Sequence, residues 1–239
     1  MSSKFIIDNM SKIFFQKNEN IFKEIFKNIN LEISGNEITV ILGKSGCGKT
    51  TLLRILAGLE NISDGKVSFL DNNNFEKKAK IGMVFQEPRL LPWLNIEKNL
   101  TVFNEKEVID IDKILSLVSL KNIKNLYPCE LSGGMASRVA IGRAIAYNPD
   151  ILLMDEPFSS LDYFTRIQLQ KEIIKIYKET KKGIIFVTHN IEEALLLGKK
   201  IIIINEKGIE QLKINEDYPR DITNSYFINL KKEILNKLL

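Results

Sequence analysis

The stretch that promises most chemistry is "GKSGCGKTT", which fits the pattern G-x-x-x-x-G-K-[ST]. In this pattern backbone N–H groups approach phosphate oxygens without obstruction from side chains. Lys49 would reach the β- and γ-phosphates, Thr50 would offer a hydroxyl to Mg²⁺, and the following helix would point its positive end at the anion. A plain glycine turn is the alternative, but an apolar run before the loop and a helical pattern after it favour a phosphate site. The expected binding residues are Gly43, Lys44, Ser45, Gly46, Cys47, Gly48, Lys49, Thr50 and Thr51.

Two adjacent acids end a second apolar run, "ILLMDEP". Ligands of open α/β sheets bind at the carboxyl ends of the strands, so this is where a nucleotide would meet the acids. Asp155 would hold Mg²⁺, as the acid at this place does in other phosphate-loop NTPases. Glu156 could polarise the attacking water as a general base. An acidic strand end is common, and only the phosphate loop makes these acids candidates for catalysis.

Two more polar side chains follow apolar runs. His189, the only histidine, follows "GIIFVT", and Gln86 follows "GMVF". If these strands are parallel, Gly43, Asp155 and His189 line one crevice, and His189 can contact the γ-phosphate. The amide of Gln86 could bind Mg²⁺ or the attacking water. A structural role for the histidine remains the alternative.

The segment "ELSGGM" is a second phosphate-binding device. Ser132 can cap a helix that begins near Gly134, whose first N–H groups then form an anion site. A flexible turn is the alternative. Because the first loop leaves the far side of the γ-phosphate open, Ser132, Gly133 and Gly134 of a second copy could close it across a two-fold axis.

The elements around these motifs predict an α/β protein. Alternating runs in "NINLEI" and "KVSFL" indicate an antiparallel β region near the N-terminus. Fully apolar runs in "EITVILG", "DILLMDE", "KGIIFVTH" and "KKIIIINE" indicate strands of a sheet covered on both faces. Residues from about 88 to 147 look mainly helical, and "NSYFINLKKEILNKLL" has the spacing of an amphipathic helix.

Composition limits the classes of function. The 239 residues carry 34 basic and 30 acidic side chains, a net charge of +4, which argues against a dedicated nucleic-acid binder. Two cysteines give no disulfide framework, so a reducing compartment is expected. We expect no secretory signal, because the first residues lack a long apolar run, and no membrane span, because no apolar run reaches about 18–20 residues.

Taken in order, the motifs resemble the nucleotide-binding subunit of an ATP-binding cassette (ABC) transporter. The resemblance extends from about residue 4 to about residue 220. It is carried by "GKSGCGKTT", "VFQEPRLLPW", "ELSGGM", "ILLMDEP", "SSLD" and "VTHN". It implies an ATPase with a RecA-like phosphate-loop core, an antiparallel β lobe and a helical lobe, in one domain over residues 1–239. Within it, about 88–147 would be the helical lobe and about 206–239 a C-terminal tail.

The resemblance also implies roles and partners. Phe14, with Phe15 as the alternative, would stack on adenine, Gln86 would couple the site to membrane subunits, and Asp162 would communicate between monomers. The cofactors would be ATP and Mg²⁺. The partners would be a second copy of the chain and two transmembrane permease subunits, with no nucleic acid, at the cytoplasmic face of the cell membrane.

A narrower similarity, in "FQEPRLLPW", "EPFSSLDYFTR" and "YPR", is to the importers of nitrate, sulfonates and taurine, a branch that includes importers of thiamine precursors. These work with an extracytoplasmic solute-binding protein. In this family "LSGG" begins a signature segment that usually continues with long polar residues, whereas this chain has Ala136 and Ser137. Gly142 also lies inside the following helix. Both departures put the stiffness of that helix and the rate of hydrolysis in doubt. The rival functions are a soluble ABC-type ATPase switch and a phosphate-loop kinase of small metabolites.

Overall fold

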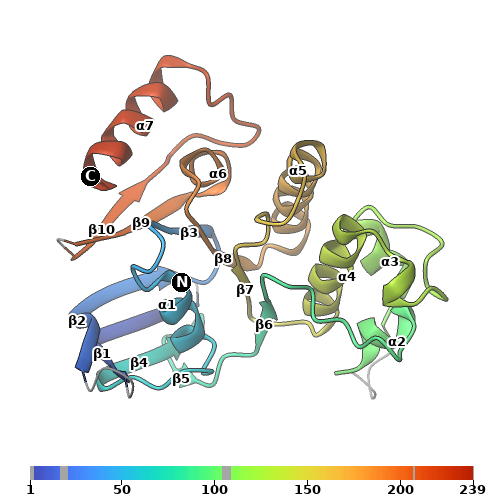
Figure 1. Ribbon diagram of the computed structural model, residues 1–239, viewed down its shortest axis with the longest axis horizontal. Helices are drawn as coiled ribbons and strands as arrows, with labels where there is room; N and C mark the ends of the chain where they lie inside the picture. The colour runs from blue at the N-terminus through green and yellow to red at the C-terminus, as the bar shows by residue number, and fades with distance from the viewer. Residues whose placement is uncertain (1–2, 17–20, 104–108, 207, 239) are drawn as a thin grey trace. The chain divides into compact units, whose positions relative to one another are not determined.

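The computed structural model describes residues 3–16, 21–103, 109–206 and 208–238. The contacts between residues divide the chain into two compact units. Unit 1 is Met1–Ala79 with Gly183–Leu239, and unit 2 is Lys80–Lys182. The helices and strands of each unit are labelled in Figure 1.

Unit 1 contains an antiparallel sheet in the strand order β2-β1-β4-β5. Its strands are β1 (Lys4–Gln16), β2 (Ile21–Ser34), β4 (Asp64–Leu70) and β5 (Glu76–Lys77). In β2 the alternation places Leu31 and Ile33 in the core while Glu32 between them is exposed. The antiparallel β region predicted near the N-terminus is therefore present.

Unit 1 also contains four strands in the order β10-β9-β3-β8. They are β3 (Ile38–Gly43), β8 (Gly183–Thr188), β9 (Lys200–Asn205) and β10 (Gly208–Lys213). β3 runs parallel to both β8 and β9, and β10 is antiparallel to β9. Every residue of β3 and β8 is buried, as the fully apolar runs predicted.

Three helices belong to unit 1: α1 (Lys49–Leu56), α6 (Ile191–Leu197) and α7 (Ser225–Leu238). Helix α7 buries one stripe, Phe227, Leu230 and Ile234, which confirms its amphipathic pattern. It packs on β9 and on α6, and its last turn ends beside β10 (Figure 1).

Unit 2 is mainly helical. Its helices are α2 (Ile96–Thr101), α3 (Ile111–Leu117), the short 3₁₀ helix Pro128–Glu130, α4 (Gly133–Ala146) and α5 (Tyr163–Thr180). Its two strands, β6 (Ile81–Val84) and β7 (Ile151–Asp155), run parallel. Helix α4 packs against α2 and α3 in a core that includes Leu100, Leu115, Val118 and Ile141. Gly142 lies here, where an added Cβ would come within 3.3 Å of both Leu100 and Ile114, so its small size suits the packing of α4.

Candidate functional site

The phosphate loop of unit 1 connects β3 to α1, in the strand–loop–helix order that the pattern requires. Lys49 is buried, and its Nζ donates to the carbonyl oxygens of Gly43 and Lys44 at 3.0 and 2.9 Å. These contacts hold the ammonium over the loop, close to the first turn of α1. A positive charge and a helix N-terminus there favour an anion.

Gly48 starts helix α1 with φ of 103°, a backbone conformation that disfavours side chains. A Cβ at this position would also lie 2.6 Å from Cγ2 of Ile25 and 2.8 Å from Cζ of Phe26. Both constraints require glycine. Because glycine has no side chain, no side-chain hydrogen bond from the described residues caps this end of α1.

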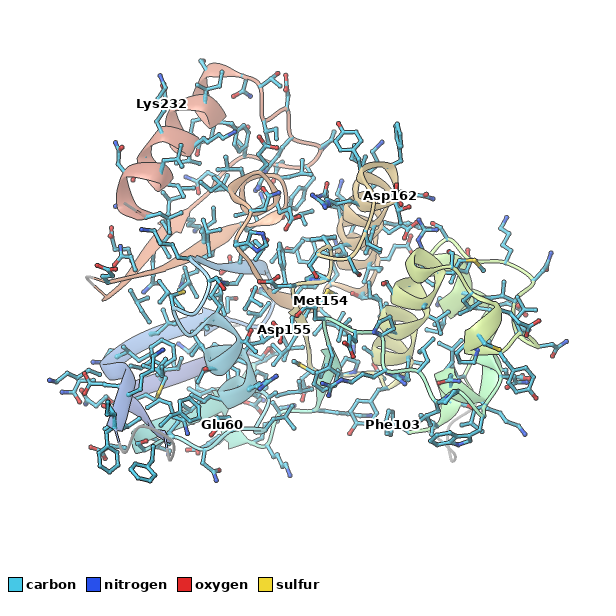
Figure 2. All side chains as sticks on the ribbon, in the orientation of Figure 1. Glu60, Phe103, Met154, Asp155, Asp162 and Lys232 are labelled. Atoms are coloured by element: carbon cyan, nitrogen blue, oxygen red, sulfur yellow. The ribbon has the colours of Figure 1, made fainter. Side chains whose placement is uncertain are left out.

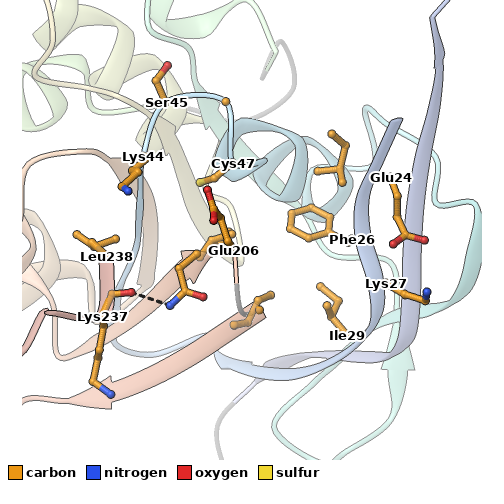
Figure 3. Close-up of a pocket in the computed structure, with 16 residues that line it drawn as sticks. Glu24, Phe26, Lys27, Ile29, Lys44, Ser45, Cys47, Glu206, Lys237 and Leu238 are labelled. Atoms are coloured by element: carbon orange, nitrogen blue, oxygen red, sulfur yellow. Dashed lines mark hydrogen bonds between the residues drawn. The ribbon is translucent and has the colours of Figure 1, made fainter. Parts of the chain in front are cut away.

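A cavity of about 1010 Å³ lies beside this loop (Figure 3). Its walls come from the loop itself, from β2, from the β9–β10 turn and from the end of α7. Figure 3 shows Cys47 and Phe26 on the loop and β2 sides, and Glu206 and Leu238 on the other. The amide of Asn205 donates to the carbonyl oxygen of Lys237 at 2.8 Å, which ties the end of α7 to β9. A ligand at the phosphate loop therefore has room beside it.

The aromatic residues predicted to stack on adenine lie on β1. Lys12 Nζ is 4.3 Å from the ring centroid of Phe14, and the same ammonium contacts Glu60 Oε1 and the Asn61 carbonyl, each at 2.6 Å. Phe15 is exposed and lies 5.0 Å, centroid to centroid, from Phe22. Neither Phe14 nor Phe15 is among the described residues that line the cavity, and the adenine contact stays a prediction.

His189 follows β8 at the edge of unit 1 where the phosphate loop begins. Thr188 pairs with Leu42 in the parallel ladder, so Gly43 and His189 leave neighbouring strands at the same edge. His189 is exposed. The shared edge agrees with the prediction for these two residues, whereas Asp155 belongs to unit 2, and the nucleotide crevice stays a prediction.

Unit 2 brings together the other candidates at the ends of its parallel strands. Val84 pairs with Met154, so Gln86 and Asp155 leave β6 and β7 at one edge. Gln86 Nε2 donates to Ser159 Oγ at 3.3 Å, and Ser159 Oγ donates to the carbonyl oxygen of Glu156 at 3.0 Å. Sequence reasoning missed Ser159, which links the glutamine to the loop of the proposed base.

The two predicted acids differ in their setting. Asp155 ends β7 and is buried, next to Met154 (Figure 2). Glu156 is half-buried with φ of 44°, in the left-handed region that side chains seldom occupy. Strained backbone of this kind is concentrated at functional sites. The backbone therefore turns at Glu156, directly after β7 ends at the buried Asp155.

The proposed magnesium ligands are Thr50, Gln86 and Asp155. Within the described ranges no group of three or more His, Cys, Asp or Glu side chains could hold a metal. The three candidates offer a hydroxyl, an amide oxygen and a carboxylate. Hard oxygen donors suit Mg²⁺, which keeps several waters and takes only one or two carboxylates, so these residue types fit the ion.

The signature segment forms the start of α4, a helix of 14 residues. Ser132 is its N-cap, and Ser132 Oγ accepts from the backbone N–H of Met135 at 3.2 Å. The predicted cap is therefore confirmed. Ser132 and Gly133 are exposed, whereas a Cβ on Gly134 would lie 2.6 Å from Cγ2 of Thr165 on α5. Gly134 thus permits the close approach of α4 and α5.

A buried ion pair also joins these two helices. Arg138 Nε lies 3.2 Å from Glu172 Oε2, and both side chains are about nine-tenths buried or more, at 11% and 5% exposed. Burial raises the pKa of the Glu172 carboxyl, and the charge of Arg138 opposes this rise. Breaking such a pair leaves an uncompensated buried charge, so it fixes how α4 lies on α5.

Asp162 is the N-cap of α5 (Figure 2) and accepts from the backbone N–H groups of Phe164 and Thr165, each at 3.1 Å. The hydrogen bond from the Thr165 side chain, with those from the backbone, holds the pKa of Asp162 below its usual range. Its role between monomers stays a prediction.

The described residues include no helix with the length and apolarity to cross a membrane.

Comparisons with known proteins agree with this arrangement. The family model described as "ABC transporter" matches residues 26–159. An uncharacterized ABC transporter ATP-binding protein of Methanocaldococcus jannaschii is 43% identical over 249 residues, covering 100% of this chain and 92% of that protein. The aliphatic sulfonates import ATP-binding protein SsuB of Bacillus anthracis is 38% identical over 239 residues, covering 97% and 94%.

Solved structures give the same result. A dimeric ATP-binding cassette in a post-hydrolysis state, bound to ADP and Pi, has a TM-score of 0.75 and 29% identity, covering 89% of this chain and 100% of that one. The expected RecA-like fold with its phosphate loop is thereby confirmed. The chain belongs to the ABC transporter family and is one of its ATP-binding, ATP-hydrolysing subunits.

Proposed function

We propose that this chain drives the import of a small solute of the sulfonate, nitrate, taurine or thiamine-precursor type. The support is the similarity to SsuB, which spans 97% of this chain and 94% of that relative. Two copies would work with two permease subunits and an extracytoplasmic solute-binding protein, at the cytoplasmic face of the membrane. Gln86 would couple the site to the permease.

The observation that carries the two-copy part of the proposal is the exposed start of helix α4. Ser132 and Gly133 present a helix N-terminus to solvent, so a nucleotide held on the phosphate loop of a second copy can meet it. Tyr163 and Phe164, next to Asp162, are 68% and 80% exposed. Adjacent exposed aromatic rings favour a protein surface that becomes covered. We infer a symmetric dimer with two shared nucleotide sites.

The chemistry follows from the residue types. Lys49 and the loop N–H groups hold the phosphates, and Phe14 holds the base. Glu156 accepts a proton from the attacking water as the water oxygen bonds to the γ-phosphorus and the bond to the ADP oxygen breaks. Lys49 and His189 stabilise the charge that develops on the γ-phosphate. Mg²⁺, held by Thr50, Gln86 and Asp155, would neutralise charge on the phosphates when bound.

The dimer is tested with Glu156→Gln, which keeps the shape of the side chain but removes the base. We expect hydrolysis to fall by about 10²–10⁴-fold. ATP should shift this variant to a dimer in light scattering, and Lys49→Ala, the matched control, should stay monomeric. Hydrolysis by Glu156→Gln at the wild-type rate would contradict the role of Glu156. A wild-type rate per chain that stays constant on dilution would contradict the shared site.

The solute is tested with the chain reconstituted in vesicles together with a candidate permease. A binding protein loaded with taurine or an alkanesulfonate should stimulate ATP hydrolysis, and the empty binding protein should not. If the chain never sediments with membranes that contain the permease, the alternative of a soluble ABC-type switch is supported instead.

A further inference from the structure

The segment "YPR" near the C-terminus lies outside the nucleotide chemistry described above, and its contacts lead to His189. We propose that Arg220 is a positioning residue that sets the place of His189 by clamping helix α6. The inference rests on the proposed role of His189 at the γ-phosphate. All the residues that carry it belong to unit 1.

Arg220 grips the carboxyl end of α6. Its Nη1 donates to the carbonyl oxygens of Leu195 at 2.8 Å and Gly198 at 2.7 Å. Its Nε and Nη2 donate to the carbonyl oxygen of Glu216 at 3.2 and 2.9 Å. Arg220 is 9% exposed, so these bonds form largely away from water. The last carbonyls of a helix lack intrahelical partners, and a cation there is favourable.

Aromatic rings hold the guanidinium in place. Its Cζ lies 4.6 Å from the ring centroid of Tyr218 and 5.9 Å from that of Phe227 on α7. The Tyr218 hydroxyl donates to the carbonyl oxygen of Leu197, the last residue of α6. The Tyr218 hydroxyl and the Arg220 guanidinium therefore meet at the carboxyl end of α6, and the Phe227 ring of α7 packs beside the guanidinium.

The other end of α6 holds the residues on both sides of His189. Thr188 Oγ1 donates to Glu193 Oε2 at 2.5 Å, and both side chains are buried. Asn190 caps α6 by accepting from the N–H groups of Glu192 and Glu193 at 2.8 and 3.4 Å. Asn190 N–H in turn donates to Thr188 Oγ1 at 3.0 Å. The backbone of His189 is thus fastened to the first turn of α6 before and after the imidazole.

Helix α6 is a short connection between these two ends. It has seven residues, about two turns, and a helix of this length is marginal unless tertiary contacts hold it. A shift at its carboxyl end therefore moves its first turn. The exposed ion pair of Lys231 Nζ with Glu192 Oε1, at 2.7 Å, adds little, because surface pairs contribute weakly. Ala194, Leu195 and Leu197 are buried where α6 packs on β3 and β8, and Arg220 and Tyr218 add the hydrogen bonds that fix its carboxyl end.

The experiment uses the fact that His189 is the only histidine, so a single pair of imidazole C–H signals in the NMR spectrum reports its surroundings. In Arg220→Met we expect these signals to shift and broaden in the nucleotide-free protein. The kcat for ATP should fall by about ten- to hundredfold, since a misplacement of about 1 Å is enough for that loss. The KM for ATP should stay within about twofold, because the phosphate loop is unchanged.

The matched control is Arg54→Met, which removes the other arginine of unit 1 at an exposed position of α1. It should leave the imidazole signals and kcat unchanged. Arg220→Lys, which keeps a donor for the two helix carbonyls, should recover part of both. If Arg220→Met does not fold, Tyr218→Phe carries the test with the same signals and a smaller expected change.

Imidazole signals that superpose on those of the wild type in a folded Arg220→Met or Tyr218→Phe would overturn the inference. A fall in kcat with unmoved signals would also overturn it. The proposed function fails separately: if His189→Ala hydrolyses ATP like the wild type, His189 has no catalytic role, while the spectrum still decides whether Arg220 positions it.

Discussion

Helices α1 and α4 both begin at glycine-containing turns, yet they are built differently. Helix α1 starts at Gly48, which offers no side chain to cap it, and Lys49 is buried at its first position. Helix α4 starts at Ser132, whose hydroxyl oxygen already accepts from the N–H of Met135. The start of α1 therefore has no side-chain cap at Gly48 and carries a buried lysine, whereas the start of α4 is capped by its own serine.

The difference indicates that the two helix starts have different roles toward a phosphate. A bare helix start with a lysine can bind phosphate by itself. A capped start without a cation adds its remaining N–H groups and the serine hydroxyl to a phosphate held elsewhere. We expect changes at α1 to damage binding, and changes at α4 to damage hydrolysis while ATP still binds to the monomer.

Of the four changes that test this comparison, Ser132→Arg has the largest expected effect. A long cation in place of the small cap would obstruct the approach of the second copy and remove donors at the γ-phosphate. Loss of one such donor typically costs about 10²–10³ in kcat. Hydrolysis and ATP binding to the dilute monomer are measured side by side. Equal losses in the two assays would show that the signature acts within one chain and that the comparison is mistaken.

Gly48→Ala should have the next largest effect, and on binding. The substitution places a side chain at φ of 103° against Ile25 and Phe26. Backbone strain of about 1–3 kcal/mol corresponds to roughly a ten- to hundredfold loss of ATP affinity if the loop moves. Gly58→Ala is the control, since Gly58 also has positive φ, at 67°, but nothing lies within 4 Å of its added Cβ. Isothermal titration should show normal affinity for Gly58→Ala, and weak binding by both would point to a general loss of stability.

Gly134→Ala should have a smaller effect, confined to hydrolysis. Its Cβ would meet Cγ2 of Thr165, so helix α4 must move away from α5. Thr165→Ser removes that methyl group and keeps the hydroxyl that bonds Asp162. We expect a several-fold slower hydrolysis in Gly134→Ala and recovery in the double variant Gly134→Ala/Thr165→Ser. A double variant as slow as the single one would mean that the glycine serves the nucleotide directly.

The smallest effect concerns Asp162, the cap of α5. Its pKa is lower in the folded protein than in the unfolded chain, so the ionised form favours folding. This contribution is present above the usual carboxyl pKa and is lost as the pH falls through the lowered value. The thermal midpoint of wild type should exceed that of Asp162→Asn slightly at neutral pH, with a gap that closes in acid. A gap independent of pH would exclude the charge as its cause.

Much of this could be predicted from local sequence. The runs "EITVILG" and "KGIIFVTH" are apolar throughout because β3 and β8 are buried along their whole length. The serine cap of α4 was also a local signal. Helices α5 and α6 were not predicted. The start of α5 had a local signal in "LDYFT", where Asp162 stands just before the residues whose backbone N–H groups donate hydrogen bonds to it.

The rest depends on contacts between residues far apart in the chain. Thr165 and Gly134 are 31 positions apart, and only packing of α4 on α5 brings their atoms together. The hydrogen bond from Arg220 to the carbonyl oxygen of Leu195 joins residues 25 positions apart, and the spacing of apolar residues could not predict it either. The strand order β2-β1-β4-β5 places β1 inside its sheet, which no alternation pattern specifies.

The left-handed backbone of Glu156 has a consequence for stability that is separate from its proposed role as the base. At φ of 44° a glycine would lie more comfortably than glutamate, by about 1 kcal/mol. Glu156→Gly should therefore melt at a higher temperature than Glu156→Gln, while both hydrolyse ATP far more slowly than the wild type. The backbone at the proposed general base would then lower the thermal stability of the protein, and a glycine would restore stability only by removing the carboxylate.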